Sequence, residues 1–550
     1  MKQAILKVHP DDNVLVALTD LKKGEEIKQN GHSITLLDDV KVKHKFAAKP
    51  IAKGEKVMMY GVLVGIAQID FEAGNVLSTA NIKHAANGFS TGERKTEWVK
   101  PDVNKWKTTT FNGFHRSNGE VGTANYWLVI PMVFCENRNL KVLEEALIAP
   151  LGYGQKKAYQ EQTLQLVDLY KKGHSVNDLL QAPLYTETVE KKQNRLFPNV
   201  DGIKFLVHDG GCGGIRQDAE TLCGLLAGYI THPNVAGATI LSLGCQNAQV
   251  SILQSEIAKR DPSFDKPVYI LEQQAVGTEA DLLSLAIKNT FAGLVQANST
   301  IRRPAPLSKI TIGLECGGSD GFSGISANPA IGYTSDLLVA LGGSVILAEF
   351  PELCGVEQNL SDRCLHTSDA ERFSALMHTY EQRATEAGSG FDMNPSPGNI
   401  KDGLITDAMK SAGAAKKGGT SPVVDVLDYP EKVTRAGLNL LCTPGNDVES
   451  TTAEVGSGAN IVLFTTGLGT PTGNPIAPVV KIASNTTLFN RMNDIIDLNT
   501  GTIIAGDETI EQAGSRILDY VIEVASGNIE VCAVKHQQDD FIPWKRGVSL

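Results

Sequence analysis

The sequence lacks the features that mark membrane, secreted and nucleic-acid-binding proteins. No apolar run reaches the roughly 18 residues that a membrane-spanning helix needs. The first residues mix charged and apolar side chains and contain no continuous apolar segment of the kind a signal peptide has. The formal net charge is −11, which argues against a general nucleic-acid binder but not against a local positive site for an acidic substrate. We therefore expect a cytoplasmic protein whose partner is a small molecule.

The sequence also lacks the short motifs of several cofactor sites. Its nine cysteines include no C-x-x-C pair, the spacing typical of zinc and redox sites. No glycine-rich turn matches a Walker P-loop or the dinucleotide fingerprint. Residues 88–92 spell the G-x-S-x-G motif of hydrolases, but no strand precedes them, and we interpret the match as chance. An odd number of thiols fits a reducing compartment.

The hydrophobic pattern changes along the 550 residues, a length that suggests about three or four domains. Residues 1–85 alternate short apolar segments with Lys-Gly-Glu turns, which predicts an all-β module. Residues 86–110 are polar without a clear period and predict a linker. Residues 111–300 and 301–550 alternate apolar strands with helical patterns, which predicts two α/β domains built on parallel sheets. The expected fold class is therefore α/β and multidomain, with a β module at the N-terminus.

Polar or glycine-rich turns follow six of the predicted strands. The most informative turn is 315–321 (Glu-Cys-Gly-Gly-Ser-Asp-Gly), directly after the apolar run 310–314. In open α/β sheets, ligands bind beyond the carboxyl ends of the strands, and parallel strands can bring several such ends to one edge. The thiols and carboxylates at these ends would suit a divalent transition metal; they are Glu315, Cys316, Asp320, Glu349, Glu352, Cys354, Asp447 and Glu449. We expect one shared site at that edge.

Other side chains suit an anionic or hydroxylated ligand. Threonines at 465, 466, 470 and 472 offer hydroxyls for a polyol, and two loops, 394–403 and 416–422, carry lysines. A lysine near the substrate carboxylate would allow an acidic protein to bind an acidic ligand. Among the histidines, His208 at a predicted strand end beside Asp209 is the best candidate for a base or ligand, followed by His84 and His115.

Long motifs, found in one order along nearly the whole chain, resemble the altronate/galactarate dehydratase family. The resemblance rests on segments 9–14, 111–116, 121–126, 210–213, 316–320, 395–399 and 464–471. It implies a β-clip module over 1–85, a linker over 86–110, a middle α/β domain over 111–300 that forms a homodimer contact, and a C-terminal Rossmann-like domain over 301–550. It also implies a divalent metal in the C-terminal domain, Fe(II) or Mn(II). Many relatives carry His-Xaa-His-Asn where this chain has Ser-Thr-Ala-Asn at 78–81, and His84 is the candidate substitute.

The resemblance further implies dehydration of a sugar acid, with D-altronate as the expected substrate and 2-keto-3-deoxy-D-gluconate as the product. A base would remove the proton next to the carboxylate, a divalent cation would stabilise the enediolate, and an acid would protonate the leaving hydroxyl. From turn position and side-chain chemistry we expect metal contacts from Cys316, Asp320 and Asp447, proton transfer by His208 or Lys401, and substrate contacts from Asn399, Thr466 and Thr470.

Three alternatives stay open at the level of the sequence. The nearest is an enzyme of the same family that acts on galactarate or another aldarate. A non-catalytic sugar-acid sensor would use the same glycine-rich loops to bind a ligand without reacting with it. An iron–sulfur dehydratase would need three convergent cysteines.

Overall fold

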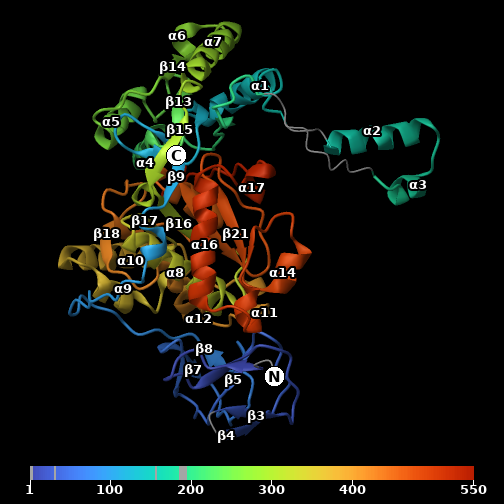
Figure 1. Cartoon of the computed structure of the whole chain (residues 1–550), viewed down its shortest axis with the longest axis vertical. Coiled ribbons are helices and arrows are strands. Elements are labelled where there is room, and N and C mark those ends of the chain that lie inside the picture. The colour runs from blue at the N-terminus through green and yellow to red at the C-terminus, as the bar shows by residue number, and fades with distance from the viewer. Residues whose placement is uncertain (1–3, 30–31, 155–157, 185–194) are drawn as a thin grey trace.

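The computed structural model describes residues 4–29, 32–154, 158–184 and 195–550 of the chain. Three bodies follow one another along the long axis of the molecule (Figure 1). The N-terminal β module lies at one end, the C-terminal body lies in the centre, and the middle body lies at the other end. Of the helices in these described ranges, none is both long and apolar enough to cross a membrane.

Small antiparallel sheets make up the N-terminal β module. Their strands are β1 (Ile5–Leu6), β2 (Val14–Ala17) and β5 (Lys45–Ala47) in one sheet, β6 (Lys56–Met59), β7 (Val62–Ala67) and β8 (Ile82–Lys83) in a second, and the hairpin β3 (Glu26–Gln29) and β4 (His32–Thr35). Gly24 and Gly54 of the Lys-Gly-Glu turns have φ of +83° and +88°, a conformation that glycine adopts without steric cost. The predicted all-β character of this segment is confirmed.

The predicted linker lies against the C-terminal body. Residues 86–103 have no regular secondary structure. Arg94 donates a hydrogen bond to the carbonyl of Ser361 (2.7 Å), and Lys95 forms an ion pair with Asp362 (2.8 Å). The linker therefore packs against the C-terminal body of its own chain.

A parallel sheet of four strands forms the centre of the middle body. Its order is β12 (Gly202–Phe205), β11 (Tyr126–Pro131), β13 (Val235–Ser242) and β14 (Val268–Glu272). The helices of this body are α1 (Asn137–Leu147), α4 (Arg216–Thr231), α5 (Val250–Arg260), α6 (Gln273–Val276) and α7 (Glu279–Ala297). Two further helices, α2 (Ala158–Lys171) and α3 (Val176–Gln181), form an arm that projects away from it (Figure 1).

A second, antiparallel sheet joins the middle body to the start of the C-terminal segment. It consists of β9 (Thr110–His115), β10 (Val121–Gly122) and β15 (Arg302–Pro306), with β9 in the centre. Residues 302–306 therefore lie with the middle body, although they follow the boundary expected at 301.

The C-terminal body contains a seven-stranded sheet in which every pairing is parallel. Its order is β18 (Val423–Leu427), β19 (Gly437–Leu441), β17 (Ser344–Leu347), β16 (Thr311–Cys316), β20 (Ile461–Thr466), β21 (Val479–Ala483) and β22 (Leu498–Asn499). From β16 the chain forms β17, then the edge strand β18 and then β19 between them, before it crosses to the other side of β16 and builds outward through β20, β21 and β22. The topological switch point is therefore between β16 and β20, which is where ligands bind in open α/β sheets.

Helices flank this sheet and connect its strands. They are α8 (Ala327–Ala340), α9 (Glu357–Arg363), α10 (Thr367–Glu386), α11 (Pro397–Lys401), α12 (Asp407–Ala414), α13 (Asp447–Gly456), α14 (Thr486–Arg491), α15 (Gly501–Ala505), α16 (Ile510–Ala525) and α17 (Cys532–Lys535). The alternation of strands and helices predicted for this part of the chain is confirmed.

Trp127 fills the core of the middle body, and its packing requires glycine at two neighbouring positions. It is fully buried. A Cβ atom on Gly237 of β13 would lie 2.5 Å from the indole ring, and one on Gly293 of α7 would lie 2.0 Å from it. Both positions need glycine because a real Cβ does not approach an aromatic carbon so closely.

We expect Gly293→Ala to lower the free energy of unfolding by about 1–3 kcal/mol, because overpacking at the indole outweighs the better helix propensity of alanine. Chemical or thermal denaturation measures the change. Gly88→Ala is the control, since a Cβ there would meet nothing within 4 Å. Equal stability of the two variants would contradict the packing described for Trp127.

Candidate active site at the edge of the C-terminal sheet

The turns after β16 and β20 lie side by side at the switch point. The amides of Gly467 and Leu468 both donate to the carbonyl of Gly318, at 3.0 and 2.9 Å. Gly318 has φ of +60°, and a Cβ on Gly467 would lie 2.2 Å from the carboxyl carbon of Asp320. The glycines of the two motifs therefore allow the turns to pack together and bring their side chains to one edge.

A buried cluster of a thiol and two carboxylates lies at this edge. Cys316 ends β16, Glu349 follows β17, and Glu352 lies in the short 3-10 helix Phe350–Leu353. Their ligand atoms all lie within 4.8 Å of one another. The Cys316 sulfur is 3.3 Å from Glu352 Oε2 and 3.6 Å from Glu349 Oε2. Two segments, the end of β16 and the turn after β17, thus converge on one point, which we call the Cys316 cluster.

Two lysines neutralise the carboxylates of the Cys316 cluster. The Nζ of Lys417 lies 2.5 Å from Glu349 and 2.9 Å from the Cys316 sulfur. Lys410 of α12 forms an ion pair with Glu352 and donates to Asn394 at 2.9 Å. Both lysines are buried. Buried charges are tolerated only when they are paired, so each lysine stabilises the carboxylate that it meets.

The acids around the cluster respond to burial in different ways. Burial, and then the negative charges of Glu349 and Glu454, raise the pKa of Glu315 well above its ordinary value. Burial, followed by Glu349 and Glu352, raises the pKa of Asp447 to about 7. Burial also acts to raise the pKa of Glu352, but Lys410 and Lys417 outweigh it and hold that pKa below its ordinary value. The edge therefore has more acidic groups than its two lysines can balance.

The donor set of the Cys316 cluster fits a divalent transition metal. Glu349 Oε1 is buried and has no hydrogen-bond partner among the described residues. Asp447 lies against the same turn, since a Cβ on Gly317 would lie 1.9 Å from its carboxylate. A thiol with several carboxylates suits such ions, and a cation would offset the negative charges of Glu349 and Glu352, which add to burial in raising the pKa of Asp447. Cys316, Glu349 and Glu352 are the residues that would hold it, with Asp447 beside them.

Asp320 lies at the same edge but is occupied by other partners. It is fully buried and accepts hydrogen bonds from Ser484 Oγ (2.8 Å), the Ser323 amide (2.9 Å) and Asn485 Nδ2 (3.1 Å). Its charge partner is Lys43, at 2.9 Å, from the N-terminal module. The structure therefore brings Cys316 and Asp447 together and uses Asp320 for a contact between two bodies.

The N-terminal module covers this edge of the sheet. Lys43 also pairs with Asp402 (2.9 Å), and Lys45 donates to the carbonyl of Gly403 (2.6 Å). A Cβ on Gly321 or Gly403 would lie 2.5 or 2.4 Å from the Lys43 carbonyl oxygen, so glycine at both positions allows the close approach. Burial lowers the pKa of Lys45 to about 7.

The residues expected to bind substrate lie next to the turn 316–321. Asn399 donates to the Ser319 carbonyl (2.7 Å) and also caps α11 with Ser396. Thr466 Oγ1 accepts from the Gly469 amide (2.9 Å). Thr470 lies 3.0 Å from Thr472, hydroxyl to hydroxyl. Their predicted roles stay predictions, but all three belong to this edge.

Of the two residues expected to transfer protons, His208 lies in the other body and Lys401 lies near this edge with an exposed side chain. His208 follows β12 in the middle body, where its Nε2 bonds the Pro131 carbonyl (2.8 Å) and its Nδ1 accepts from the Gly210 amide (3.1 Å). Burial lowers the pKa of His208. Lys401 is exposed at the end of α11. Sequence reasoning did not single out the lysines 43, 45 and 410 that lie at this edge, whereas Lys417 belongs to a loop that it had singled out.

Comparison with known proteins gives one consistent result. Family models described as the altronate/galactarate dehydratase SAF domain, the second domain of D-galactarate dehydratase/altronate hydrolase and the C-terminal part of D-galactarate/altronate dehydratase match residues 3–85, 113–298 and 307–549. Altronate dehydratase of Bacillus subtilis is 34% identical over 100% of both chains, and that of Escherichia coli is 32% identical over 99% of both. The L-threo-forming galactarate dehydratase of Escherichia coli is 29% identical over 95% of this chain and 92% of its own. The chain belongs to the altronate/galactarate dehydratase family.

Proposed function

We propose that this protein is a hydro-lyase that removes water from D-altronate and forms 2-keto-3-deoxy-D-gluconate. The observation that carries the proposal is the buried Cys316 cluster with its two lysines, placed at the switch point of a parallel sheet. The end-to-end similarity to two altronate dehydratases, at 34% and 32% identity, supports altronate over galactarate, whose dehydratase is 29% identical.

Lys410 and Lys417 supply positive charge where the reaction develops negative charge. Removal of the proton next to a carboxylate creates an enediolate, which needs preorganised electrostatic stabilisation. Burial acts to lower the pKa of both lysines, but neighbouring carboxylates, Glu352 for Lys410 and Glu349 for Lys417, outweigh it and raise the pKa of each, so both stay charged at neutral pH. A bound Fe(II) or Mn(II) ion would add Lewis-acid stabilisation of the same oxygens.

Lys45 is the group whose acid–base properties best suit proton abstraction. A general base works well when its pKa lies near the working pH, and burial lowers the pKa of Lys45 to about 7. Its Nζ reaches the loop at Gly403, close to the turn that carries Asp320. We favour Lys45 over His208 and Lys401, because His208 follows a strand of the other sheet and Lys401 is exposed.

The finer architecture is part of the proposal. We infer a β-clip module over 1–85, a linker over 86–110, a middle domain over 111–300 and a Rossmann-like domain over 301–550. The switch point in the C-terminal sheet supports the last assignment. A cytoplasmic location agrees with nine cysteines that form no disulfide.

We also propose that the protein is a homodimer with its contact in the middle body. The arm of α2 and α3 supports this because it carries large apolar side chains on its surface: Tyr159 is 81% exposed, Tyr170 72% and Leu180 77%. Exposed apolar patches of this kind mark interaction sites.

We expect the purified protein to form a 2-keto-3-deoxy acid from D-altronate, and less or none from D-galactarate, when Fe(II) is supplied under reducing conditions. Product is measured by chromatography and mass spectrometry, with Mn(II) tested in parallel. Turnover of galactarate in preference to altronate would move the assignment to the other branch of the family. Binding of altronate without product from either acid would favour a sugar-acid sensor and reject the proposal.

We expect Lys410→Met to lower kcat by about 10²–10³, because a preorganised charge at the reacting centre is lost. Steady-state kinetics on altronate measure the effect, and circular dichroism checks that the variant folds. Lys416→Met is the matched control: it removes a lysine from the same segment, but one that interacts with Arg363 and Asp12 and not with the Cys316 cluster. Equal rates for both variants would remove Lys410 from the mechanism.

A further inference from the structure

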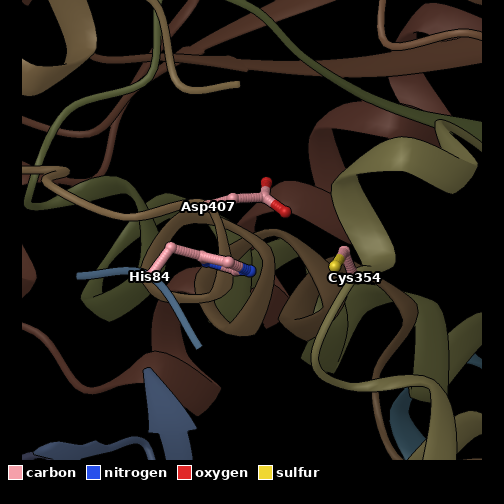
Figure 2. A group of neighbouring side chains, drawn as sticks. All are labelled: His84, Cys354 and Asp407. Carbon is pink, nitrogen blue, oxygen red and sulfur yellow. The ribbon is translucent and has the colours of Figure 1, made fainter. Parts of the chain in front are cut away.

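A second group of metal-type ligands lies where the N-terminal module meets the C-terminal body. His84 follows β8, Cys354 follows the 3-10 helix Phe350–Leu353, and Asp407 is the first residue of α12. Their ligand atoms all lie within 4.8 Å of one another. The imidazole, the thiol and the carboxylate face a common space (Figure 2). None of the three residues belongs to the Cys316 cluster.

We propose that His84, Cys354 and Asp407 hold a divalent transition metal ion, with zinc as the best match, and that this ion ties the end of the N-terminal module to the C-terminal body. Zinc accepts nitrogen, sulfur and oxygen ligands together, whereas calcium and magnesium take oxygen ligands. Three protein ligands leave a fourth tetrahedral position, which a water molecule would fill.

The environment of the Asp407 carboxylate is the observation that favours a bound cation. Asp407 is 1% exposed, and its Oδ2 makes no hydrogen bond of normal geometry within the described part of the chain. Its Oδ1 accepts a 3.3 Å contact from Ser411, and the other polar side chain that interacts with the carboxylate is the Cys354 thiol, itself one of the three ligands. A buried carboxylate with so few donors is costly, and a cation facing Oδ2 would remove the cost.

The surrounding charges leave the position open for a metal. Lys410, one turn along α12 from Asp407, is committed to Glu352. Among the described residues, no ion pair involves His84 or Asp407. In this respect the site differs from the Cys316 cluster, where each carboxylate already meets an ammonium group.

The backbone around the three ligands is packed and holds them in place. Gly355 has φ of +91°, and a Cβ on it would lie 3.1 Å from the Cβ of Ala408 and 3.4 Å from that of Ala86. The neighbours of all three ligands therefore touch at one point. Thr406 adds a bond across the boundary, from its hydroxyl to the Val64 carbonyl (2.8 Å). Zinc–ligand bonds of about 2.0–2.3 Å need the ligand atoms to close in by only about 1 Å.

Metal binding would cost His84 only one long hydrogen bond. Its Nδ1 receives a contact of 3.4 Å from the Ala408 amide, at the long limit of a hydrogen bond. Coordination through either ring nitrogen replaces this contact with a stronger bond. Because His84 lies two positions before the linker begins at residue 86, the ion would fix the module in the position that places Lys43 and Lys45 on the sheet edge.

The test measures zinc bound by the full-length protein and does not depend on activity. Protein stripped of metal is dialysed against zinc alone, and the bound equivalents are counted by mass spectrometry. We expect Cys354→Ser and His84→Gln each to bind one equivalent fewer than the unaltered chain. Cys532→Ser and His44→Gln are matched controls at half-buried positions, and we expect both to keep the full count.

Cobalt separates this site from the Cys316 cluster. We expect a sulfur-to-cobalt charge-transfer band that persists in Cys316→Ser and is lost or reduced in Cys354→Ser. Zinc should also raise the thermal midpoint of the unaltered protein and not that of Cys354→Ser, because a ligand that binds only the folded state stabilises it. An unchanged zinc count in Cys354→Ser, or a cobalt band that disappears completely in Cys316→Ser, would overturn the proposal.

Discussion

The ion pair between Lys43 and Asp320 is the contact on which the assembled site depends. Asp320 is fully buried at the switch point of the C-terminal sheet, and its charge partner comes from a module 277 positions earlier in the chain. A buried carboxylate that loses its partner costs several kcal/mol. The edge of the sheet is therefore stable in this form only while the N-terminal module is docked on it.

Docking of the module makes the candidate active site a composite of two bodies. The C-terminal body contributes the Cys316 cluster with Lys410 and Lys417, and in the proposed mechanism the module contributes Lys45. The glycines at 321 and 403 allow the module's backbone to approach. The proposed metal at His84, Cys354 and Asp407 would act at the same boundary, where Asp407 lies four positions after Gly403. The proposed catalytic site is therefore complete only when the module is docked.

The sequence predicted the elements of this arrangement better than their assembly. The strand-end turns that carry Cys316, Glu349, Glu352 and Asp447 were identifiable because apolar runs precede them. Strand β21 was missed because Lys481, fully buried in the structure, interrupts its apolar pattern. His208 was placed in the site because the rule that ligands bind at strand ends does not say which of two parallel sheets is meant. The lysines of the module were missed because nothing in the sequence shows where a module docks.

A double-mutant cycle on Lys43 and Asp320 tests the composite site most directly. The values of kcat/KM on D-altronate are measured for Lys43→Met, Asp320→Asn and the double variant. If the pair positions the module, the two losses are not independent, and the cycle gives a coupling free energy of about 1–3 kcal/mol. Losses that add to within about 0.5 kcal/mol would show that the two side chains act separately and would contradict the account.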